Sequence, residues 1–419
     1  MTFTSSQRLP RSVNAIAVGR GISFLGDEVA LLAILFRARY ELGHFGVAAI
    51  MIAGALPLLL LAPFVGLLVD RVRTKPLLVV VTIAQAALCV ALAWSSSELL
   101  VPLIALLACG TAIAAPAWQA LIPTIVREDQ LSAAMGRLQS MTAIAQVAGP
   151  FVGGVLVAYF GFHVPLLVDA VSFAVLAAVP LALRVDRRPA VGADKGFSMR
   201  EAFAGVRIVF AHPVIRSLVV LAVLFVLAIG VINVVEIYFI TTALHAGPRG
   251  YGLLGVCMGV GMLLVGLGAG RLAQRFGHPE RLFTAGCVVL CGAILGFGFT
   301  VQLWQAAVLI FACGIGNGLV NVNAMVLITA HSTDEYRGRI FSAVNGTVSA
   351  AQITSIAIGG LLLLRFSPRP IIVVGALTSI LALALTIAPV LRAGAASPAH
   401  AGDGAPQRAE TSATDPAAA

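Results

Sequence analysis

The chain has 419 residues, of which 59% are hydrophobic and only 11% are charged, and its mean hydropathy is +1.00. A typical soluble domain is about 45–50% apolar and about 25% charged, so this composition excludes a soluble enzyme, a disordered chain and a DNA-binding domain as the main interpretation. The net charge of +9 fits basic residues gathered in the cytoplasmic loops of a membrane protein better than it fits a nucleic-acid partner.

Apolar runs of about 20 residues follow one another along the chain. Only helices and closed barrels satisfy backbone hydrogen bonds within lipid, and these runs do not alternate strictly, so they predict an all-α integral membrane protein with twelve transmembrane helices. The first run lacks a small-residue cleavage site, and we expect it to be retained as a span. The predicted spans are 13–36, 46–69, 77–95, 99–122, 138–159, 164–183, 215–243, 250–272, 282–300, 304–330, 339–364 and 371–391.

The basic residues predict the orientation of these spans. If the N-terminus is cytoplasmic, 21 of the 27 Lys and Arg residues fall in the inner segments and Arg20 falls within the first span. Five remain for the outer segments, namely Arg37, Arg39, Arg249, Arg365 and Arg369. This bias predicts a multi-pass protein of the cytoplasmic (inner) membrane with both termini in the cytoplasm.

The longest internal polar stretch divides the spans six and six. We therefore expect a cytoplasmic N-terminal segment (1–12), a six-helix bundle (13–183), a cytoplasmic linker with an amphipathic helix (184–214), a second six-helix bundle (215–391) and a disordered cytoplasmic tail (392–419).

The two halves carry a weak internal repeat. The end of the second span, GLLVDRVRTK (66–75), resembles the end of the eighth, GRLAQRFG (270–277). Two related sets of six spans, forming two pseudo-symmetric six-helix bundles, are typical of transporters whose substrate site lies near mid-membrane between the halves.

Five charged residues within the spans are candidates for proton coupling: Arg20, Asp27, Glu28, Asp169 and Glu236. A charge at the bilayer centre costs at least about 2.5–3.5 kcal/mol, and an apolar surrounding favours the protonated form of a carboxyl group. Asp27 and Glu28 are adjacent and point about 100° apart on a helix, so both cannot face the cavity equally. For Asp27 or Glu28 the alternative is a fixed charge bonded to Arg20 or to the backbone. Glu236 is a candidate for coupling or cation recognition, and its alternatives are a buried hydrogen-bonded strut and a position near the outer membrane face. For Asp169 we favour a structural role.

Several polar or aromatic side chains are candidates for the substrate cavity. Asn233 precedes Glu236 by three residues, and Asn317 and Asn321 share one helix face. The weaker candidates are Phe24, Trp118, Gln119 and Gln146. Hydrogen bonding between helices is the alternative role for the asparagines.

Three motifs make the chain resemble the major facilitator superfamily over residues 13–391. The loop after the second span carries Gly66, Leu68, Asp70, Arg71 and Lys75 of G-x-L-x-D-R-x-G-R-[RK], with Arg73 and Thr74 as departures. The antiporter motif of the fifth span, G-x8-G-x3-G-P-x2-G-G, is matched by Gly136, Gly149, Pro150, Gly153 and Gly154, with Ala145 in place of a glycine. FLGDEV in the first span and REAFAGVRIVFAHPVIR before the seventh are similar to the macrolide, multidrug and siderophore exporter branch.

The resemblance implies the major facilitator fold and export in exchange for protons. It implies that Asp70 holds the neighbouring half through a helix N-terminus while the inner side is closed, and that Arg71 and Arg73 complete this gate. The fourth span contains no charge, whereas many drug–proton antiporters have an arginine there.

The sequence offers no other energy source and no catalytic centre. Neither lysine lies in a G-x4-G-K-[ST] loop, no two histidines are four residues apart, and all six cysteines fall within apolar runs, so we expect no cofactor and no metal. We predict a secondary active transporter, not an enzyme, that exports small hydrophobic molecules such as drugs or secondary metabolites by proton antiport. Its partners are the substrate, protons and the lipid bilayer, without nucleic acid, and we expect a monomer. The alternatives are an importer or uniporter of the same fold and a membrane-embedded enzyme or receptor, for which no loop is long enough.

Overall fold

The computed structural model describes residues 10–183, 213–276, 278–330 and 334–396. The described residues form twelve α-helices, one on each predicted span, and no strand, which confirms the all-α membrane fold. The first six are α1 (Arg11–Glu41), α2 (Gly46–Arg71), α3 (Thr74–Trp94), α4 (Ser97–Leu121), α5 (Glu128–Phe160) and α6 (His163–Ala182). The second six are α8 (Pro213–Thr242), α9 (Pro248–Phe276), α10 (Pro279–Gly298), α11 (Leu303–Ala330), α12 (Asp334–Leu362) and α13 (Pro368–Ala396). The predicted amphipathic helix of the linker lies outside the described residues, apart from the last positions of 184–214.

Several helices extend beyond the apolar runs that predicted them. α5 begins at Glu128 rather than near residue 138, and α13 continues to Ala396, five residues into the segment predicted to be disordered from 392. Hydropathy marks the part of a helix that contacts lipid, whereas the helix itself continues as long as its backbone hydrogen bonds are made. Among the described residues, nine helices are long and apolar enough to cross a membrane. The other three are α1, α2 and α12. α1 carries the charged residues Arg20, Asp27 and Glu28, and the apolar stretches of α2 and α12, Gly46–Leu61 and Gly346–Leu362, are shorter.

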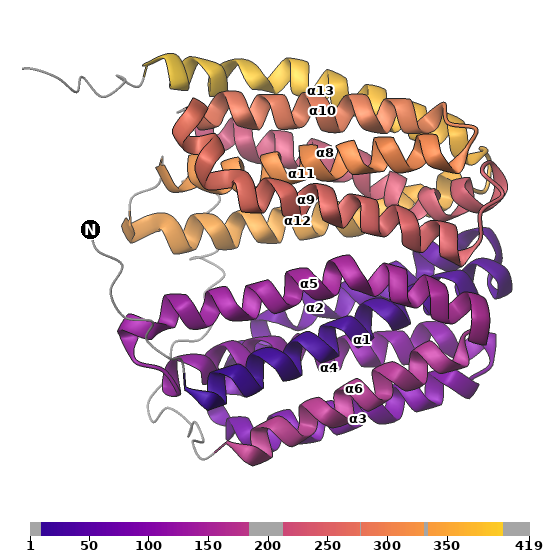
Figure 1. Ribbon diagram of the computed structural model, residues 1–419, viewed down its shortest axis with the longest axis vertical. Coiled ribbons are helices and arrows are strands. Elements are labelled where there is room, and N and C mark those ends of the chain that lie inside the picture. The colour runs from indigo at the N-terminus through magenta and orange to yellow at the C-terminus, as the bar shows by residue number, and fades with distance from the viewer. Residues whose placement is uncertain (1–9, 184–212, 277, 331–333, 397–419) are drawn as a thin grey trace, which may run out of the picture.

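The helices group in space as they do along the chain. α1 to α6 pack with one another and form the lower group in Figure 1, and α8 to α13 form the upper group. The two groups meet mainly where α5 packs on α9 and where α2 packs on α12. This arrangement agrees with the predicted two sets of six spans.

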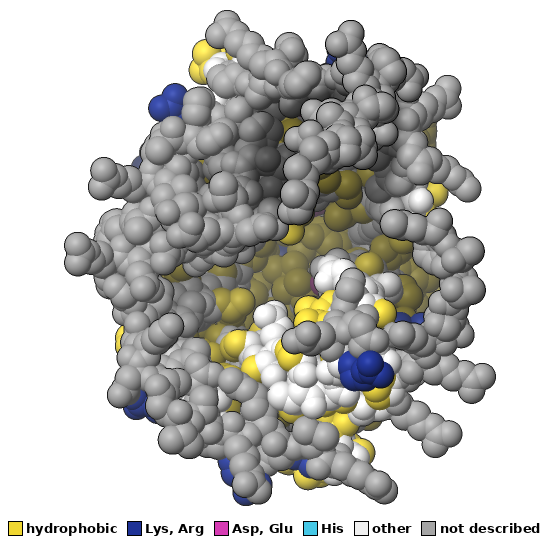
Figure 2. All heavy atoms as spheres, turned by 90° about the vertical axis from the view of Figure 1, so that its left-hand side faces the viewer, with side chains coloured by type: hydrophobic (Ala, Val, Ile, Leu, Met, Phe, Trp, Pro, Cys, Tyr) yellow, Lys and Arg dark blue, Asp and Glu magenta, His cyan; other side chains and the backbone are white. Residues whose placement is uncertain are grey.

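The two ends of the molecule differ. We call the end that holds Arg11 and Ala396 the inner end and the opposite end, with η1 (Gly43–Phe45) and the turn at Gly161, the outer end. Figure 2 looks onto the inner end, where the surface is hollowed and hydrophobic side chains line the hollow. Among the described residues, the contacts of Tyr238 with Gly43 and of Gly154 with Pro248 join the two groups towards the outer end, whereas the described surface is hollowed at the inner end (Figure 2).

Arginine and aromatic side chains join the two groups at the outer end. The Arg39 guanidinium of α1 lies 4.5 Å from the ring centroid of Tyr238 in α8, and the Arg249 guanidinium of α9 lies 3.9 Å from that of Tyr159 in α5. The Tyr238 hydroxyl donates to the Gly43 carbonyl oxygen at 2.9 Å. Each group thus supplies an arginine to an aromatic ring of the other group. Each cation–π contact contributes about 0.5–2 kcal/mol.

A second pair of outer arginines stabilises single groups. Arg37 donates from Nη1 to the Leu92 carbonyl oxygen at 2.8 Å and from Nη2 to the Ser95 carbonyl oxygen at 2.5 Å, at the end of α3. Arg369 donates to the Thr300 carbonyl oxygen at 2.9 Å, just beyond α10. Carbonyl groups at a helix C-terminus lack partners within the helix, and these guanidinium groups supply them. Four of the five arginines predicted on the outer side therefore have defined intramolecular partners.

We expect Arg37→Met to lower the melting temperature of the protein. Arg37 is 8% exposed, and its loss would remove the charged donors to the Leu92 and Ser95 carbonyl oxygens and the ion pair with Glu41. Each hydrogen bond to a charged group contributes about 1.5–3 kcal/mol. Thermal unfolding in detergent, followed by circular dichroism, measures the change. Arg365→Met is the matched control, because Arg365 is an exposed outer arginine; equal melting temperatures for the two variants would contradict this interpretation.

Candidate functional site

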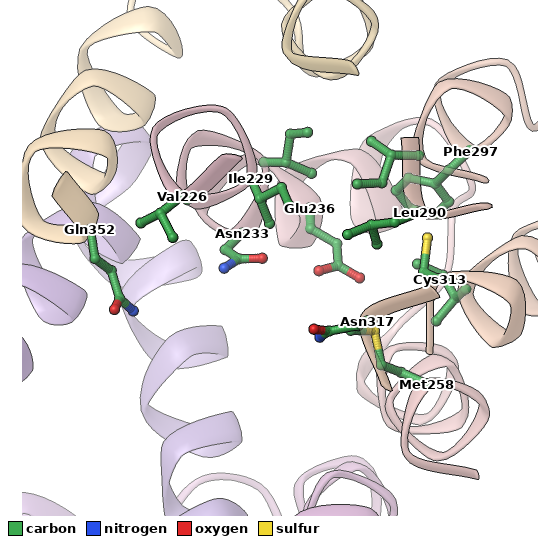
Figure 3. A pocket seen from close by; sticks show the side chains of 14 residues that line it. Val226, Ile229, Asn233, Glu236, Met258, Leu290, Phe297, Cys313, Asn317 and Gln352 are labelled. Atoms are coloured by element: carbon green, nitrogen blue, oxygen red, sulfur yellow. The ribbon is translucent and has the colours of Figure 1, made fainter. Parts of the chain in front are cut away.

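A cavity of about 260 Å³ lies within the second group of helices. Four polar side chains face it: Asn233 and Glu236 from α8, Asn317 from α11 and Gln352 from α12 (Figure 3). Asn233 and Gln352 are exposed, and Glu236 and Asn317 are half-buried, so all four can be reached from the open space between the helices. Three of these four were candidates from the sequence, and they come together here because α8 and α11 both line the cavity.

The rest of the cavity wall is mainly apolar. Met258 comes from α9, Leu290 and Phe297 from α10, and Cys313 from α11. Glu236 is the single carboxyl group among the described residues that line the cavity. Within the part of the chain described here, its side chain forms no hydrogen bond or ion pair that would neutralise its charge. An apolar pocket with a few convergent polar groups is the usual form of a site for a small organic molecule.

The two asparagines of α11 interact as their spacing predicts. Asn321 Nδ2 donates to the Asn317 side-chain oxygen at 2.5 Å and to its carbonyl oxygen at 2.9 Å. This bond orients the Asn317 amide, which lines the cavity, whereas Asn321 is exposed beside it. Their role towards a substrate stays a prediction.

The adjacent acids of α1 contact different neighbours, as expected for side chains about 100° apart. A Cβ atom at Gly149 of α5 would overlap the Glu28 side chain, so the stem of Glu28 packs against the α5 backbone. Gly26 packs against α6 on another side of α1, next to Asp27. Arg20 forms no ion pair with either acid in the described structure; its guanidinium lies 5.5 Å from the ring centroid of Phe24, within electrostatic range of Asp27.

Asp169 is buried away from the cavity. It is 1% exposed and accepts hydrogen bonds from Ser172 of the same helix and Cys89 of α3. A structural role was the favoured prediction for Asp169, and its enclosed position is compatible with that role.

The antiporter motif of α5 lies between two helices. Gly149 and Gly153 pack on α1, where a Cβ at Gly153 would lie 3.1 Å from the Val29 Cα. Pro150 and Gly154 pack on α9 instead, and a Cβ at Gly154 would lie 2.6 Å from the Pro248 carbonyl oxygen. The small residues thus allow α5 to approach its own group on one face and the opposite group on the other.

The gating loop lies at the inner end, between α2 and α3. α2 ends at Arg71, and Arg71 and Arg73 are exposed. The side-chain environments of Gly66 and Asp70 lie outside the described structure, so their predicted gating role stays a prediction.

The remaining cavity candidates lie in different environments. Trp118 is 1% exposed and packs in a cluster of buried side chains that includes Ile16, Leu78 and Leu121, so it does not line the cavity. Gln119 and Gln146 are exposed, and Phe24 is half-buried beneath Arg20.

Gln352 and the partners of Asp169 were not predicted from the sequence. Gln352 stands among Ser, Thr and Ala in α12, where one more polar residue carries little signal. Cys89 and Asp169 are 80 residues apart, so only the packing of α3 on α6 reveals their contact. The described His, Cys, Asp and Glu residues form no group of three or more that could hold a metal ion.

Comparison with known sequences places these features in a family. Residues 38–393 match the model of the family described as transmembrane secretion effector. The chain is 27% identical over 372 residues to "Uncharacterized MFS-type transporter YfiS" of Bacillus subtilis (strain 168), covering 85% of this chain and 87% of that protein. It is 23% identical over 357 residues to "Macrolide efflux protein A" of Streptococcus pyogenes, covering 80% of this chain and 85% of that protein.

Comparison with solved structures gives the same fold. A crystal structure of a point mutant of the peptide transporter POT superposes with a TM-score of 0.75 over 94% of this chain and 96% of that chain. The sequences are 13% identical, so this likeness concerns the fold alone.

Proposed function

The chain belongs to the transmembrane secretion effector family of major facilitator transporters, and on this basis we propose that it exports small hydrophobic molecules, such as drugs or secondary metabolites, in exchange for protons. It is thus a multi-pass membrane transporter and not an enzyme. The observation that carries the proposal is the mainly apolar cavity in which Glu236 is the single described carboxyl group. The name of the Streptococcus pyogenes relative, a macrolide efflux protein, supports export as the direction.

Sidedness follows from the charge bias. The inner end lies in the cytoplasm, because 21 of the 27 basic residues fall in segments assigned to that side. Both termini are then cytoplasmic, the membrane is the cytoplasmic membrane, and the hollow at the inner end admits substrate from the cell. One chain supplies both halves, and the protein works as a monomer.

The transport cycle uses the two six-helix bundles as rigid bodies. Residues 13–183 and 215–391 rock about the contact of α5 with α9, where Pro150 and Gly154 of the antiporter motif provide close packing without bulky side chains. When the inner end closes, Asp70, Arg71 and Arg73 hold the two bundles together. The contacts of Arg39, Arg249 and Tyr238 at the outer end are then broken.

Glu236 couples the substrate to the proton in this cycle. Asn233, Asn317 and Gln352 donate and accept hydrogen bonds to polar atoms of the substrate, and the apolar wall binds its hydrocarbon part. A proton that enters from the outside neutralises Glu236, weakens the polar contacts and releases the substrate. The empty carrier returns with its proton and loses it to the cytoplasm. Asp27 and Glu28 are the further candidates for proton binding, and Arg20 tunes them.

Everted membrane vesicles test the direction and the driving force. We expect them to accumulate a macrolide and a lipophilic fluorescent dye when their interior is made acidic, because protons then leave as substrate enters. Collapse of the proton gradient by an ionophore should stop accumulation. Uptake by right-side-out vesicles under an inward proton gradient would instead establish the importer, and gradient-independent equilibration would establish the uniporter. Vesicles without the protein provide the background.

A further inference from the structure

A second polar cluster lies inside the first six helices, apart from the cavity around Glu236. It comprises Asp169 and Ser172 of α6 and Cys89 of α3, which are 1%, 3% and 0% exposed. The Cys89 Sγ–H donates to Asp169 Oδ2 at 3.3 Å, and the Ser172 hydroxyl lies 3.0 Å from Oδ1. All the residues that line the cavity come from α8 to α12, so the two sites share no side chain.

α1 closes this cluster with a glycine. A Cβ atom at Gly26 would lie 2.6 Å from Asp169 Oδ1 and would overlap the Ser172 hydroxyl, so only glycine lets α1 come this close to the carboxyl group. The next residue is Asp27, which lies within electrostatic range of Asp169, Glu28 and Arg20. The Gly26 contact therefore brings the α1 backbone against the Asp169 carboxyl group, with Asp27 as the next residue of α1.

The hydrogen bonds of the cluster fit both protonation states of Asp169. When the carboxyl group is ionised, it accepts from Cys89 and from the Ser172 hydroxyl. When it carries a proton, it can donate to the Ser172 oxygen, while the Ser172 hydroxyl donates to the Asp169 carbonyl oxygen 2.8 Å away. The two states differ by the rotation of one hydroxyl group, and neither leaves a buried polar group without a partner.

The charges around Asp169 favour a state in which the carboxyl groups of Asp169 and Asp27 hold one proton between them. No ion pair in the described structure involves Asp169, and an isolated buried carboxylate is costly. The titratable groups that face it are Asp27, with Glu28 and Arg20 beyond it, from α1 and Cys89 from α3; His163 lies at the start of its own helix. Two carboxyl groups near one another disfavour double ionisation, so the pair titrates as a unit.

We propose that Asp169 and Asp27 together form a proton-binding site of the first bundle, separate from the cavity that binds the substrate. Asp27, which is half-buried, exchanges protons with solvent in the hollow. Asp169, which is buried, shares the bound proton with Asp27. Loss of the proton leaves a charge at the Gly26 contact between α1 and α6, which links protonation to the packing of these helices. This inference rests on the proposed proton exchange and locates part of it.

Reconstituted transport separates this site from the substrate site. In proteoliposomes, we expect Asp169→Asn to retain substrate exchange at equal pH on both sides but to lose proton-driven accumulation by about tenfold or more. Asp27→Asn should behave in the same way, whereas Cys109→Ser, the same change at a cysteine of α4 outside the cluster, should remain active in both assays. An Asp169→Asn variant that accumulates substrate as the wild type does would overturn the proposal. A wild-type protein that exchanges no macrolide would instead contradict the proposed function.

Infrared difference spectroscopy tests proton binding without transport. The purified wild type should show a protonated carboxyl band that disappears on raising the pH, and this band should be missing in Asp169→Asn. Cys89→Ser should shift its frequency, because the hydrogen-bond partner of the same carboxyl group changes from sulfur to oxygen. If Asp169→Asn does not fold, the Cys89→Ser spectrum still decides: an unchanged band would show that Asp169 does not carry the proton.

Discussion

Glu236→Gln should abolish proton-driven export while leaving the protein folded in the membrane. Glutamine keeps the volume and the hydrogen-bonding capacity of the side chain but can neither bind nor release a proton. Because Glu236 is the single carboxyl group among the described residues that line the cavity, no neighbour there can replace it. We expect the initial rate of dye accumulation in everted vesicles to fall about 10- to 100-fold.

Two controls give this result its meaning. Asn233→Ala removes a polar group from the same cavity without a titratable proton and should weaken substrate binding while keeping the pH dependence of transport. Equal amounts of each variant in the membrane, measured by immunoblot, exclude a defect in insertion. If Glu236→Gln transports at the wild-type rate with the wild-type pH dependence, Glu236 has no coupling role.

Gly154→Leu should prevent the outer end from closing and should reduce transport at least about tenfold. Even the Cβ atom of a substituted residue would lie 2.6 Å from the Pro248 carbonyl oxygen, and a backbone atom cannot move aside as a flexible side chain can. The bundles must then separate where α5 meets α9. The expected consequence is a larger population that is open to the outside.

Gly136→Leu provides a matched control on the same helix. A Cβ atom at Gly136 has no neighbour within 4 Å among the described residues, so this variant should transport normally. Spin labels at Ser96 and Gln302, exposed positions on the outer ends of the two groups, report the opening through their separation. We expect longer distances between the labels in Gly154→Leu than in Gly136→Leu. The same distance distribution in both variants would show that the contact of α5 with α9 does not control opening of the outer end.

Much of the fold could be predicted because each span is visible in the sequence as an apolar run. The runs predicted every described helix, but not the start of α5 at Glu128, since a helix that leaves the bilayer keeps its hydrogen bonds after its hydropathy has fallen. Glu236, Asn233 and Asn317 were predictable because polar residues in lipid-length runs are costly and rare. Trp118 carried no such signal: a large aromatic side chain suits a packed core as well as a cavity, and here it lies in the core.

The contacts between distant residues could not be predicted. Whether Asp169 faces Cys89, lipid or the hollow depends on the rotation of α3 and α6 about their axes, and that rotation is determined by the packing of all neighbouring helices together. The outer arginines illustrate the same limit. Arg37 and Arg39 lie in an outer segment and are therefore exceptions to the excess of basic residues on the inner side. In the structure each of them has a defined partner.

The cation–π contacts that join the two bundles at the outer end have a consequence for biosynthesis. In the proposed orientation, each outer arginine is translocated against a membrane potential that is negative inside, which costs about 2.3 kcal/mol per charge for every 100 mV. Arg37 recovers part of this cost within its own bundle as soon as α3 is made. Arg39 must wait for Tyr238, which the ribosome adds some 200 residues later, and Tyr159 must wait for Arg249. The nascent first half therefore lies in the bilayer without these two contacts at its outer end. They can form only after α8 and α9 have been translated.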